Sequence, residues 1–196
     1  MAHIDYYLSV LSPYCYLAGT RLEGIAERAG TVVRYKPLDV RALFAQTGGV
    51  GPKDRHPNRM AYRAQELQRQ SAKLGLPLNM QPAFWPTNPA PASYAVIAAQ
   101  DAGGGDLGGL VHGLMRACWA EERDIAQDDV IGACLVDNGF DAGLTMTGML
   151  AGAETYARNL DESVAAGAFG APFYVTEQDQ RFWGQDRLED LAAALA

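Results

Sequence analysis

Ser12 is the residue whose type and position point most directly to chemistry. It lies between an apolar run at residues 4–8 and helix-like residues 17–29, and Pro13 follows it. Serine before proline often begins a helix, because serine caps free backbone N–H groups and proline suits the first turn. A helix start also stabilises an anion or thiolate without a metal. Taken alone, however, the stretch favours the simpler interpretation that Ser12 and Pro13 only cap a helix.

Cys15 stands three residues after Ser12, so Ser-Pro-Tyr-Cys has the spacing of a redox Cys-x-x-Cys motif whose first cysteine is replaced. A disulfide oxidoreductase acting alone would lack half of its machinery. This leaves Cys15 as a remnant or a packed thiol. No His or acidic residue adjoins Ser12 to serve as its base, which argues against a serine hydrolase.

The cysteines and histidines predict neither disulfides nor a metal site. They are Cys15, Cys118, Cys134, His3, His56 and His112. Three widely spaced cysteines suit reduced thiols, and no histidine pairs with another or with a cysteine at metal-ligand spacing. His112 and Cys118 lie six residues apart, on different faces of a helix, which favours packing or solvent positions over a catalytic pair.

The overall composition narrows the class of protein. The 196 residues are 48% hydrophobic and 20% charged, and the formal net charge is −7, as in a globular protein of one medium domain or of a small domain with an insertion. The negative charge argues against nucleic acid as a partner. The N-terminus does not resemble a signal peptide, and no apolar run reaches the roughly 18 residues of a membrane span. We therefore expect a cytoplasmic protein.

Hydrophobic periodicity predicts a sheet at the two ends of the chain and helices between them. Residues 4–9, 17–29 and 31–38 favour strand, helix and strand, and the end of the chain favours two strands and a helix, at residues 172–176, 180–183 and 187–194. This order describes an α/β fold, a thioredoxin-like domain interrupted by an all-helical insert. We assign residues 1–45 and 167–196 to the first domain and residues 46–166 to the insert.

The insert is predicted to begin with a loop, which is followed by helices. Residues 46–59 favour a loop, residues 77–91 a proline-rich link, and the helices are predicted at residues 60–75, 92–102, 107–123, 128–138 and 147–166. The glycine-rich stretch at residues 103–108 matches the dinucleotide-binding pattern GxGxxG. That pattern requires a preceding strand, whereas residues 95–100 are helix-like, so we interpret the stretch as an interhelical loop.

Four motifs along the chain carry a family resemblance. They are Leu11-Ser12-Pro13-Tyr14, Gly51-Pro52-Lys53-Asp54-Arg55, Gly167-Ala168-Phe169-Gly170-Ala171-Pro172 and Phe182-Trp183-Gly184-Gln185-Asp186-Arg187-Leu188. In this order and at these separations, they resemble the 2-hydroxychromene-2-carboxylate isomerases, DsbA-like proteins grouped with kappa-class glutathione transferases. The resemblance extends over the whole chain. It implies a glutathione-dependent isomerase of naphthalene-type aromatic degradation, which interconverts 2-hydroxychromene-2-carboxylate and trans-o-hydroxybenzylidenepyruvate, and it implies a homodimer.

The resemblance also implies roles for individual residues. Ser12 corresponds to the catalytic serine whose hydroxyl faces the glutathione sulfur. Ala171 precedes Pro172, where the family has a cis peptide bond and offers backbone hydrogen bonds to glutathione. Gln185 and Asp186 correspond to the positions that hold the γ-glutamyl end, although Asp186 also suits a simple cap of the last helix.

The sequence departs from the family pattern at three of these positions. Asp54, also a glutathione contact by resemblance, and Gln185 replace asparagines, and Ala171 replaces a valine. These changes affect the glycyl-end contacts and the affinity rather than the class of enzyme. A kappa-like glutathione transferase and a DsbA-like thiol-disulfide oxidoreductase remain alternatives.

Overall fold

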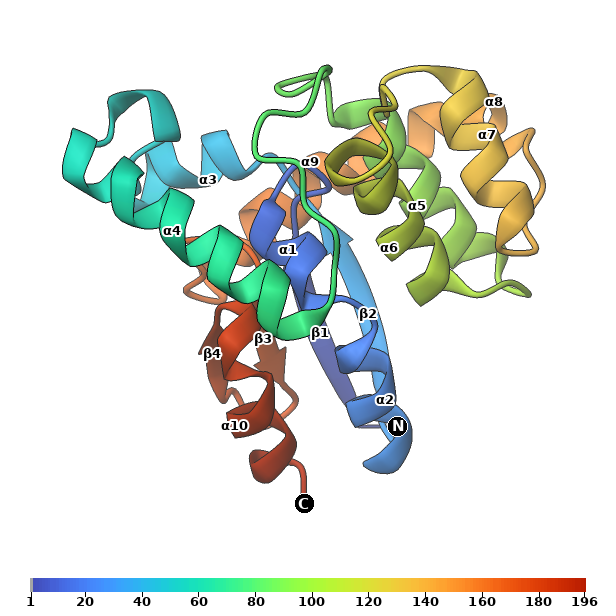
Figure 1. The fold of residues 1–196 in the computed structure, drawn as a ribbon. Coiled ribbons are helices and arrows are strands. Elements are labelled where there is room, and N and C mark those ends of the chain that lie inside the picture. The colour runs from blue at the N-terminus through green and yellow to red at the C-terminus, as the bar shows by residue number, and fades with distance from the viewer. Residues whose placement is uncertain (1) are drawn as a thin grey trace.

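A four-stranded sheet built from both ends of the chain forms the centre of the fold. The computed structural model describes residues 2–196. The strands are β1 (His3–Leu8), β2 (Val32–Pro37), β3 (Phe173–Thr176) and β4 (Arg181–Trp183), in the order β2-β1-β3-β4. β1 pairs in parallel with β2 and antiparallel with β3, and β3 pairs antiparallel with β4 (Figure 1).

The register confirms that the two ends of the chain share one sheet. Tyr7 lies opposite Phe173 and Asp5 opposite Val175, so the strands predicted from residues 4–9 and 172–176 are direct neighbours. β1 and β3 are almost entirely buried, which explains their continuous apolar character. The predicted thioredoxin-like sheet is therefore present.

Helices fill the remainder of the chain. They are α1 (Pro13–Ala18), α2 (Arg21–Arg28), α3 (Val40–Thr47), α4 (Pro57–Leu74), α5 (Ala90–Ala102), α6 (Leu107–Trp119), α7 (Asp128–Asp137), α8 (Leu144–Thr147), α9 (Met149–Ala165) and α10 (Leu188–Ala194), with the 3-10 turns η1 (Pro52–Asp54) and η2 (Gln185–Arg187). Figure 1 shows α3 to α9 above the sheet, with α10 beside β4 near the C-terminus. Within residues 2–196, no helix combines the length and apolar character that crossing a membrane demands.

The single helix predicted for residues 17–29 is wrong, because the chain breaks at Gly19. Gly19 has φ +61° and closes α1 by donating from its N–H to the carbonyl of Tyr16. Few residues other than glycine adopt this backbone conformation, so α1 ends there and α2 starts a new direction at Arg21. The break leaves α1 as a short separate helix with Ser12 at its start.

The predicted boundaries also differ within the insert. Residues 46–59 contain the end of α3, the turn η1 and the first turn of α4, which starts at Pro57 because His56 caps it. α6 ends at Trp119 rather than at residue 123, and α8 forms a separate turn before α9. The glycine-rich stretch does follow a helix, α5, as predicted. The domain boundaries stay a prediction. The boundary expected between residues 45 and 46 falls inside α3.

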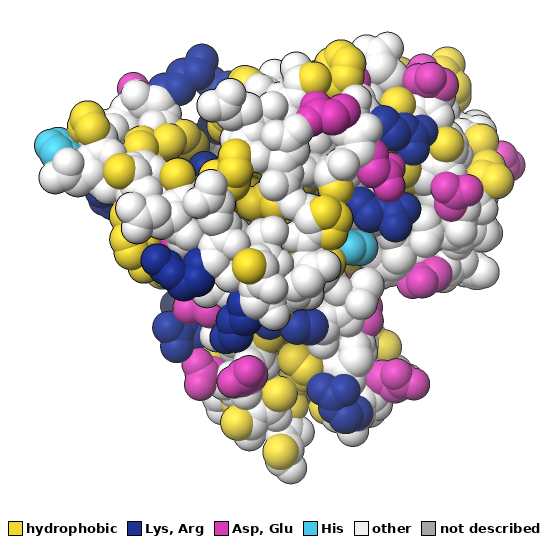
Figure 2. Space-filling model, in the orientation of Figure 1, with side chains coloured by type: hydrophobic (Ala, Val, Ile, Leu, Met, Phe, Trp, Pro, Cys, Tyr) yellow, Lys and Arg dark blue, Asp and Glu magenta, His cyan; other side chains and the backbone are white. Residues whose placement is uncertain are grey.

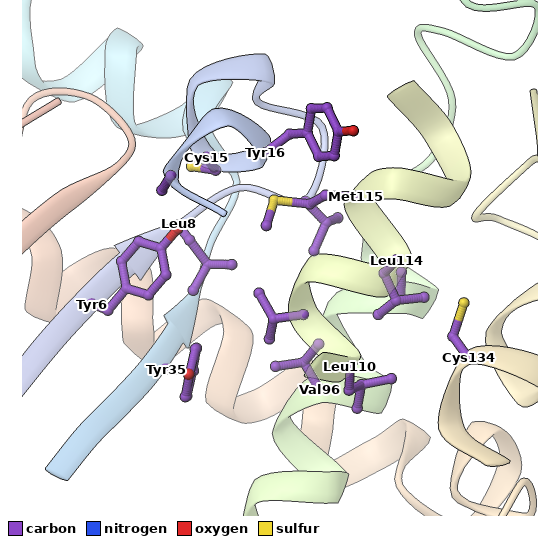
Figure 3. Packing of buried hydrophobic residues seen from close by; sticks show 14 of the residues in the cluster. Tyr6, Leu8, Cys15, Tyr16, Tyr35, Val96, Leu110, Leu114, Met115 and Cys134 are labelled. Carbon is purple, nitrogen blue, oxygen red and sulfur yellow. The ribbon is translucent and has the colours of Figure 1, made fainter. Parts of the chain in front are cut away.

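One large hydrophobic core joins the sheet to the helices. Tyr6 and Leu8 of β1 belong to one buried cluster with Val96 of α5 and Leu110 of α6, and Cys15 and Tyr16 of α1 lie above them in Figure 3. A second, smaller cluster on the opposite face of the sheet packs Phe173 and its neighbours against α3 and α9. α1 is thus held between the sheet and the insert, which fixes the position of Ser12.

Candidate functional site

Ser12 lies at the N-cap of α1 and contacts the C-terminal part of the chain. Its Oγ accepts a hydrogen bond from the backbone N–H of Cys15 and donates one to the carbonyl of Ala171, each at 3.3 Å. Both distances are long for hydrogen bonds, and a hydroxyl donor normally lies about 2.7–2.8 Å from its acceptor. The hydrogen bond from Ser12 to Ala171 is therefore weak, and the hydroxyl can rotate to donate to a better acceptor.

Ala171 presents one unused backbone donor beside Ser12. The Ala171–Pro172 peptide bond is cis, as predicted. The carbonyl of Ala171 accepts from Ser12, whereas its N–H donates to no group within residues 2–196. Because β3 begins only at Phe173, this part of the backbone lies outside the sheet ladder and remains able to pair with an extended peptide.

Cys15 lies beneath Ser12 and points into the core. Its side chain is fully buried, and burial raises the pKa of its thiol to about 11, with Ser9, Ser12 and Tyr6 close enough to oppose this shift in part. In Figure 3, Cys15 lies on the core side of α1, above the hydroxyl of Tyr6. At neutral pH the thiol is un-ionised, so Cys15 has the character of a packed thiol rather than a nucleophile.

The segment that follows β4 brings Gln185 and Asp186 of η2 against α1. The N–H of Gly184 donates to the carbonyl of Pro172 at 3.0 Å, and η2 packs against α1. Asp186 is exposed and forms an ion pair with Arg187 at 3.2 Å. Its carboxylate lies over Gly184, whose φ of +112° is in the region that favours glycine.

Gln185 has a different environment from Asp186. It is only 3% exposed, and its side-chain oxygen accepts from the guanidinium of Arg21 at 2.6 Å. Arg21 also donates to the carbonyls of Leu17 and Ala18. The Gln185 side chain therefore ties η2 to the end of α1 and to α2, and this tie fixes where Asp186 stands.

Asp54 directly precedes Arg55, the first of a group of arginines that the sequence analysis did not single out. Asp54 is exposed at the end of η1. The guanidinium of Arg63 lies 6.0 Å from the ring centre of Tyr14, close enough for a cation–π contact. The pKa of Arg55 is lowered chiefly by burial and also by its neighbour Arg59.

Arg55, Arg59 and Arg63 recur at every fourth residue, but only Arg59 and Arg63 lie in α4, where this spacing places both side chains on one helix face, because Arg55 precedes the helix cap at His56. None of them forms an ion pair with another residue in the described range 2–196. The four-residue spacing was the available signal, but residues 46–59 were assigned to a loop. Arg63 thus brings a positive charge beside Tyr14 of α1, whereas Arg55 donates to the carbonyl of Val50.

A cavity of about 280 Å³ lies elsewhere, between α6 and α7. It is lined by Gly109, His112, Gly113, Arg116, Glu121, Arg123, Cys134, Asp137 and Asn138. The ring of His112 lines the cavity and stacks on the ring of Tyr16, whereas Cys118 is buried and does not line the cavity. The charges of the lining residues balance, and Figure 2 likewise shows basic and acidic side chains intermixed on this face. Neither Ser12 nor Ala171 lines this cavity.

The described residues contain no group of three or more His, Cys, Asp or Glu side chains arranged to hold a metal ion. Ser12 instead contributes a hydroxyl beside a backbone N–H, and two of the elements that contact α1 carry a carboxylate, Asp186 of η2, and a guanidinium, Arg63 of α4. Such a set can bind an extended, charged peptide and stabilise a negative charge at the start of α1.

Two curated relatives resemble the chain over its whole length. The 2-hydroxychromene-2-carboxylate isomerase of Sphingobium xenophagum is 29% identical over 195 residues, covering 98% of this chain and 97% of that protein. The protein of the same name from Pseudomonas putida is 28% identical, covering 98% and 93%.

Solved structures show the same fold. A structure of 2-hydroxychromene-2-carboxylate isomerase superposes with a TM-score of 0.78 at 26% identity, covering 98% of this chain and 94% of that one. The cytosolic disulfide reductase DsbM from Pseudomonas aeruginosa, solved with GSH, gives a TM-score of 0.69 at 22% identity and covers 98% and 96%. The profile of the DSBA-like thioredoxin domain matches residues 3–196. Because this match spans nearly the whole sequence, the protein belongs to the DSBA-like thioredoxin domain family.

Proposed function

We propose that the protein is a glutathione-dependent isomerase that interconverts 2-hydroxychromene-2-carboxylate and trans-o-hydroxybenzylidenepyruvate in aromatic degradation. The observation that carries the proposal is the pairing of the Ser12 hydroxyl with Ala171, whose N–H has no partner among residues 2–196. The two full-length relatives that bear the name of this isomerase support the assignment.

Reduced glutathione fits the residues around Ser12. Its sulfur would lie at Ser12, the peptide of its cysteine would pair with the free N–H of Ala171, and its γ-glutamyl ammonium would meet the exposed carboxylate of Asp186. Pro172 would fix the backbone of Ala171. Gln185 would act through position, because its side chain holds η2 against Arg21. DsbM, solved with GSH, is a fold neighbour that contains the same tripeptide.

The glycyl carboxylate of glutathione would lie on the side of α1 that carries Asp54 and the arginines. A carboxylate repels another carboxylate, so the side chain of Asp54 cannot supply the attraction that an asparagine amide would supply. We therefore assign the attraction to Arg55, Arg59 and Arg63, with Asp54 as a neighbouring contact. The guanidiniums offer charge-assisted hydrogen bonds that replace those of the missing amide.

When bound, glutathione supplies a thiolate that adds reversibly to a conjugated double bond, which then behaves as a single bond and can rotate. Ser12 would donate a hydrogen bond to this sulfur, and the N-terminus of α1 would add its partial positive charge. Lowering a thiol pKa from about 8.5 to about 6.5 raises the ionised fraction at pH 7 from roughly 3% to about three quarters. This shift requires the site to stabilise the thiolate by about 2.7 kcal/mol.

Calorimetry with reduced glutathione, repeated with a chelator, tests the binding step. We expect a metal-independent affinity in the micromolar to millimolar range, and no binding at millimolar glutathione would refute the proposal. Turnover of 2-hydroxychromene-2-carboxylate should then require glutathione without consuming it. Stoichiometric consumption would instead identify a glutathione transferase.

The cellular setting follows from the same proposal. An enzyme that uses reduced glutathione operates in a reducing compartment, and the three cysteines are all free thiols, so we place the protein in the cytoplasm.

We also propose a homodimer, as the family resemblance implies. The exposed apolar side chains of Met146, Met149 and Leu150 are candidates for its interface, and sedimentation of Leu150→Glu beside wild type would test their role.

A further inference from the structure

The segment at residues 77–89, which lies beside α1, is fixed in place by contacts at both of its ends. At its start, the hydroxyl of Tyr16 donates to the carbonyl of Pro77 at 2.7 Å. At its end, the hydroxyl of Thr87 donates to the carboxylate of Asp124 at 2.6 Å. A segment held at both ends by buried or part-buried groups presents its side chains in defined positions.

Trp85 is the side chain by which this segment contacts the residue before the start of α1. Its indole N–H donates to the carbonyl of Leu11 at 3.3 Å, and Leu11 directly precedes Ser12. The ring centre lies 5.7 Å from that of the buried Trp119, which supports one edge of the indole. Trp85 is half-buried, and its N–H is already used, so the part that remains accessible is apolar ring surface.

From this placement we propose that Trp85 forms the wall against which the aromatic ring of the substrate packs. This inference rests on the proposed isomerase function and adds a specificity-determining residue to it. A planar ring gains most by offset or edge contact with another aromatic ring, and Trp offers the largest such surface of any side chain.

A fixed wall also suits the geometry of the reaction. The isomerisation rotates one half of the substrate relative to the other, so one half must be held while the other moves. The aromatic ring, held at Trp85, would stay in place while the keto-acid end turns near Ser12. The hydrogen bond from Trp85 to Leu11 fixes the indole relative to Ser12. The aromatic ring of the substrate would therefore stay at a constant distance from Ser12.

Trp85→Leu and Trp85→Phe test the proposal. Removing the ring in Trp85→Leu should raise KM for 2-hydroxychromene-2-carboxylate roughly three- to tenfold, and Trp85→Phe should restore most of this loss. The calorimetric Kd for glutathione should be the same in both variants and in wild type. An aliphatic β,γ-unsaturated α-keto acid, which lacks the ring, should show no such rise in KM.

A fluorescence titration separates this inference from the proposed function. The aromatic keto acid should quench the tryptophan emission of wild type and of Trp183→Phe to the same extent, and that of Trp85→Phe clearly less, whether or not turnover is seen. Unchanged KM in Trp85→Leu, an equal loss with the aliphatic keto acid, or a larger fall in quenching in Trp183→Phe than in Trp85→Phe would each overturn the role of Trp85. Absence of glutathione-dependent turnover in wild type would overturn only the proposed function.

Discussion

The hydroxyl of Ser12 lies 3.3 Å from the carbonyl oxygen of Ala171, a residue 159 positions further along the chain. The contact joins the start of the first helix to the loop before β3, and the cis peptide at Pro172 belongs to the same loop. The Ser12 hydroxyl and the free backbone N–H of Ala171 therefore lie beside each other.

Replacing Ser12 by Ala should weaken stabilisation of the glutathione thiolate. Loss of a hydrogen bond to a charged acceptor costs about 1–3 kcal/mol, or roughly 5- to 150-fold in kcat/KM. Steady-state kinetics would measure this loss, and the ultraviolet absorbance of the bound thiolate should titrate at a higher pH than in wild type. Unchanged isomerisation in Ser12→Ala would show that Ser12 is not the thiolate-stabilising residue.

Ser12→Cys should convert the protein towards a redox enzyme. The variant contains a complete Cys-Pro-Tyr-Cys motif, with the new thiol at the helix start, where the pKa of a thiol is lowered. Disulfide reductase activity should appear in a turbidity assay with insulin and should vanish when Cys15→Ser is added. Wild type should be inactive, because burial raises the pKa of Cys15 to about 11; activity through Cys15 in wild type would contradict this assignment.

The arginines of α4 should contribute to glutathione affinity through its glycyl carboxylate. Arg59→Gln or Arg63→Gln should each raise the Kd for glutathione on the order of tenfold at low salt, and less at high salt. Arg69→Gln is the matched control, because Arg69 lies on the same helix but forms an ion pair with Glu66. The glycyl monoethyl ester of glutathione should bind wild type and variants alike; a variant-dependent Kd for the ester would refute the assignment.

Glu23 should make stability depend on pH. Burial raises the pKa of its carboxyl above 4.5, although the hydroxyl of Tyr35, which donates to it at 2.5 Å, opposes the shift. A folded-state pKa above the unfolded value stabilises the fold fully below the unfolded pKa, and this stability is lost as pH rises through the folded value.

The Tm of Glu23→Gln minus that of wild type should therefore increase as the pH is raised from about 4.5 to 8, because only wild type must bury the Glu23 carboxylate at the higher pH. Thermal melts across this range, with the exposed Glu27→Gln as control, would measure the difference. A constant Tm difference between the two proteins would contradict the assignment.

Local patterns were sufficient to predict the parts of the fold that depend on nearby residues. β1 and β3 are short apolar runs, and β2 is rich in β-branched residues and ends at a proline. The cis peptide at Pro172 was expected from the family resemblance and not from local pattern. The break at Gly19 was missed, because apolar residues keep their helical spacing on both sides of it. Only the positive φ of Gly19 separates α1 from α2.

Side-chain contacts between distant residues could not be predicted from the sequence. Gln185 was expected to bind a ligand directly, but its oxygen is used by Arg21, 164 residues away. The bond between Trp85 and Leu11 spans 74 residues and arises in a proline-rich link that has no periodicity. Such pairings depend on how the whole chain packs, so no window of neighbouring residues contains them.

The place of β3 in the sheet has a consequence for biosynthesis. β1 can pair with β2 once the first 37 residues have left the ribosome, but its other edge remains open until residues 173–176 emerge. An exposed strand edge attracts other chains, and pairings between distant segments form slowly. A nascent chain that stalls before Pro172 would therefore expose β1 to aggregation while lacking half of the Ser12 site, so chaperone demand should be greatest during the synthesis of α5 to α9.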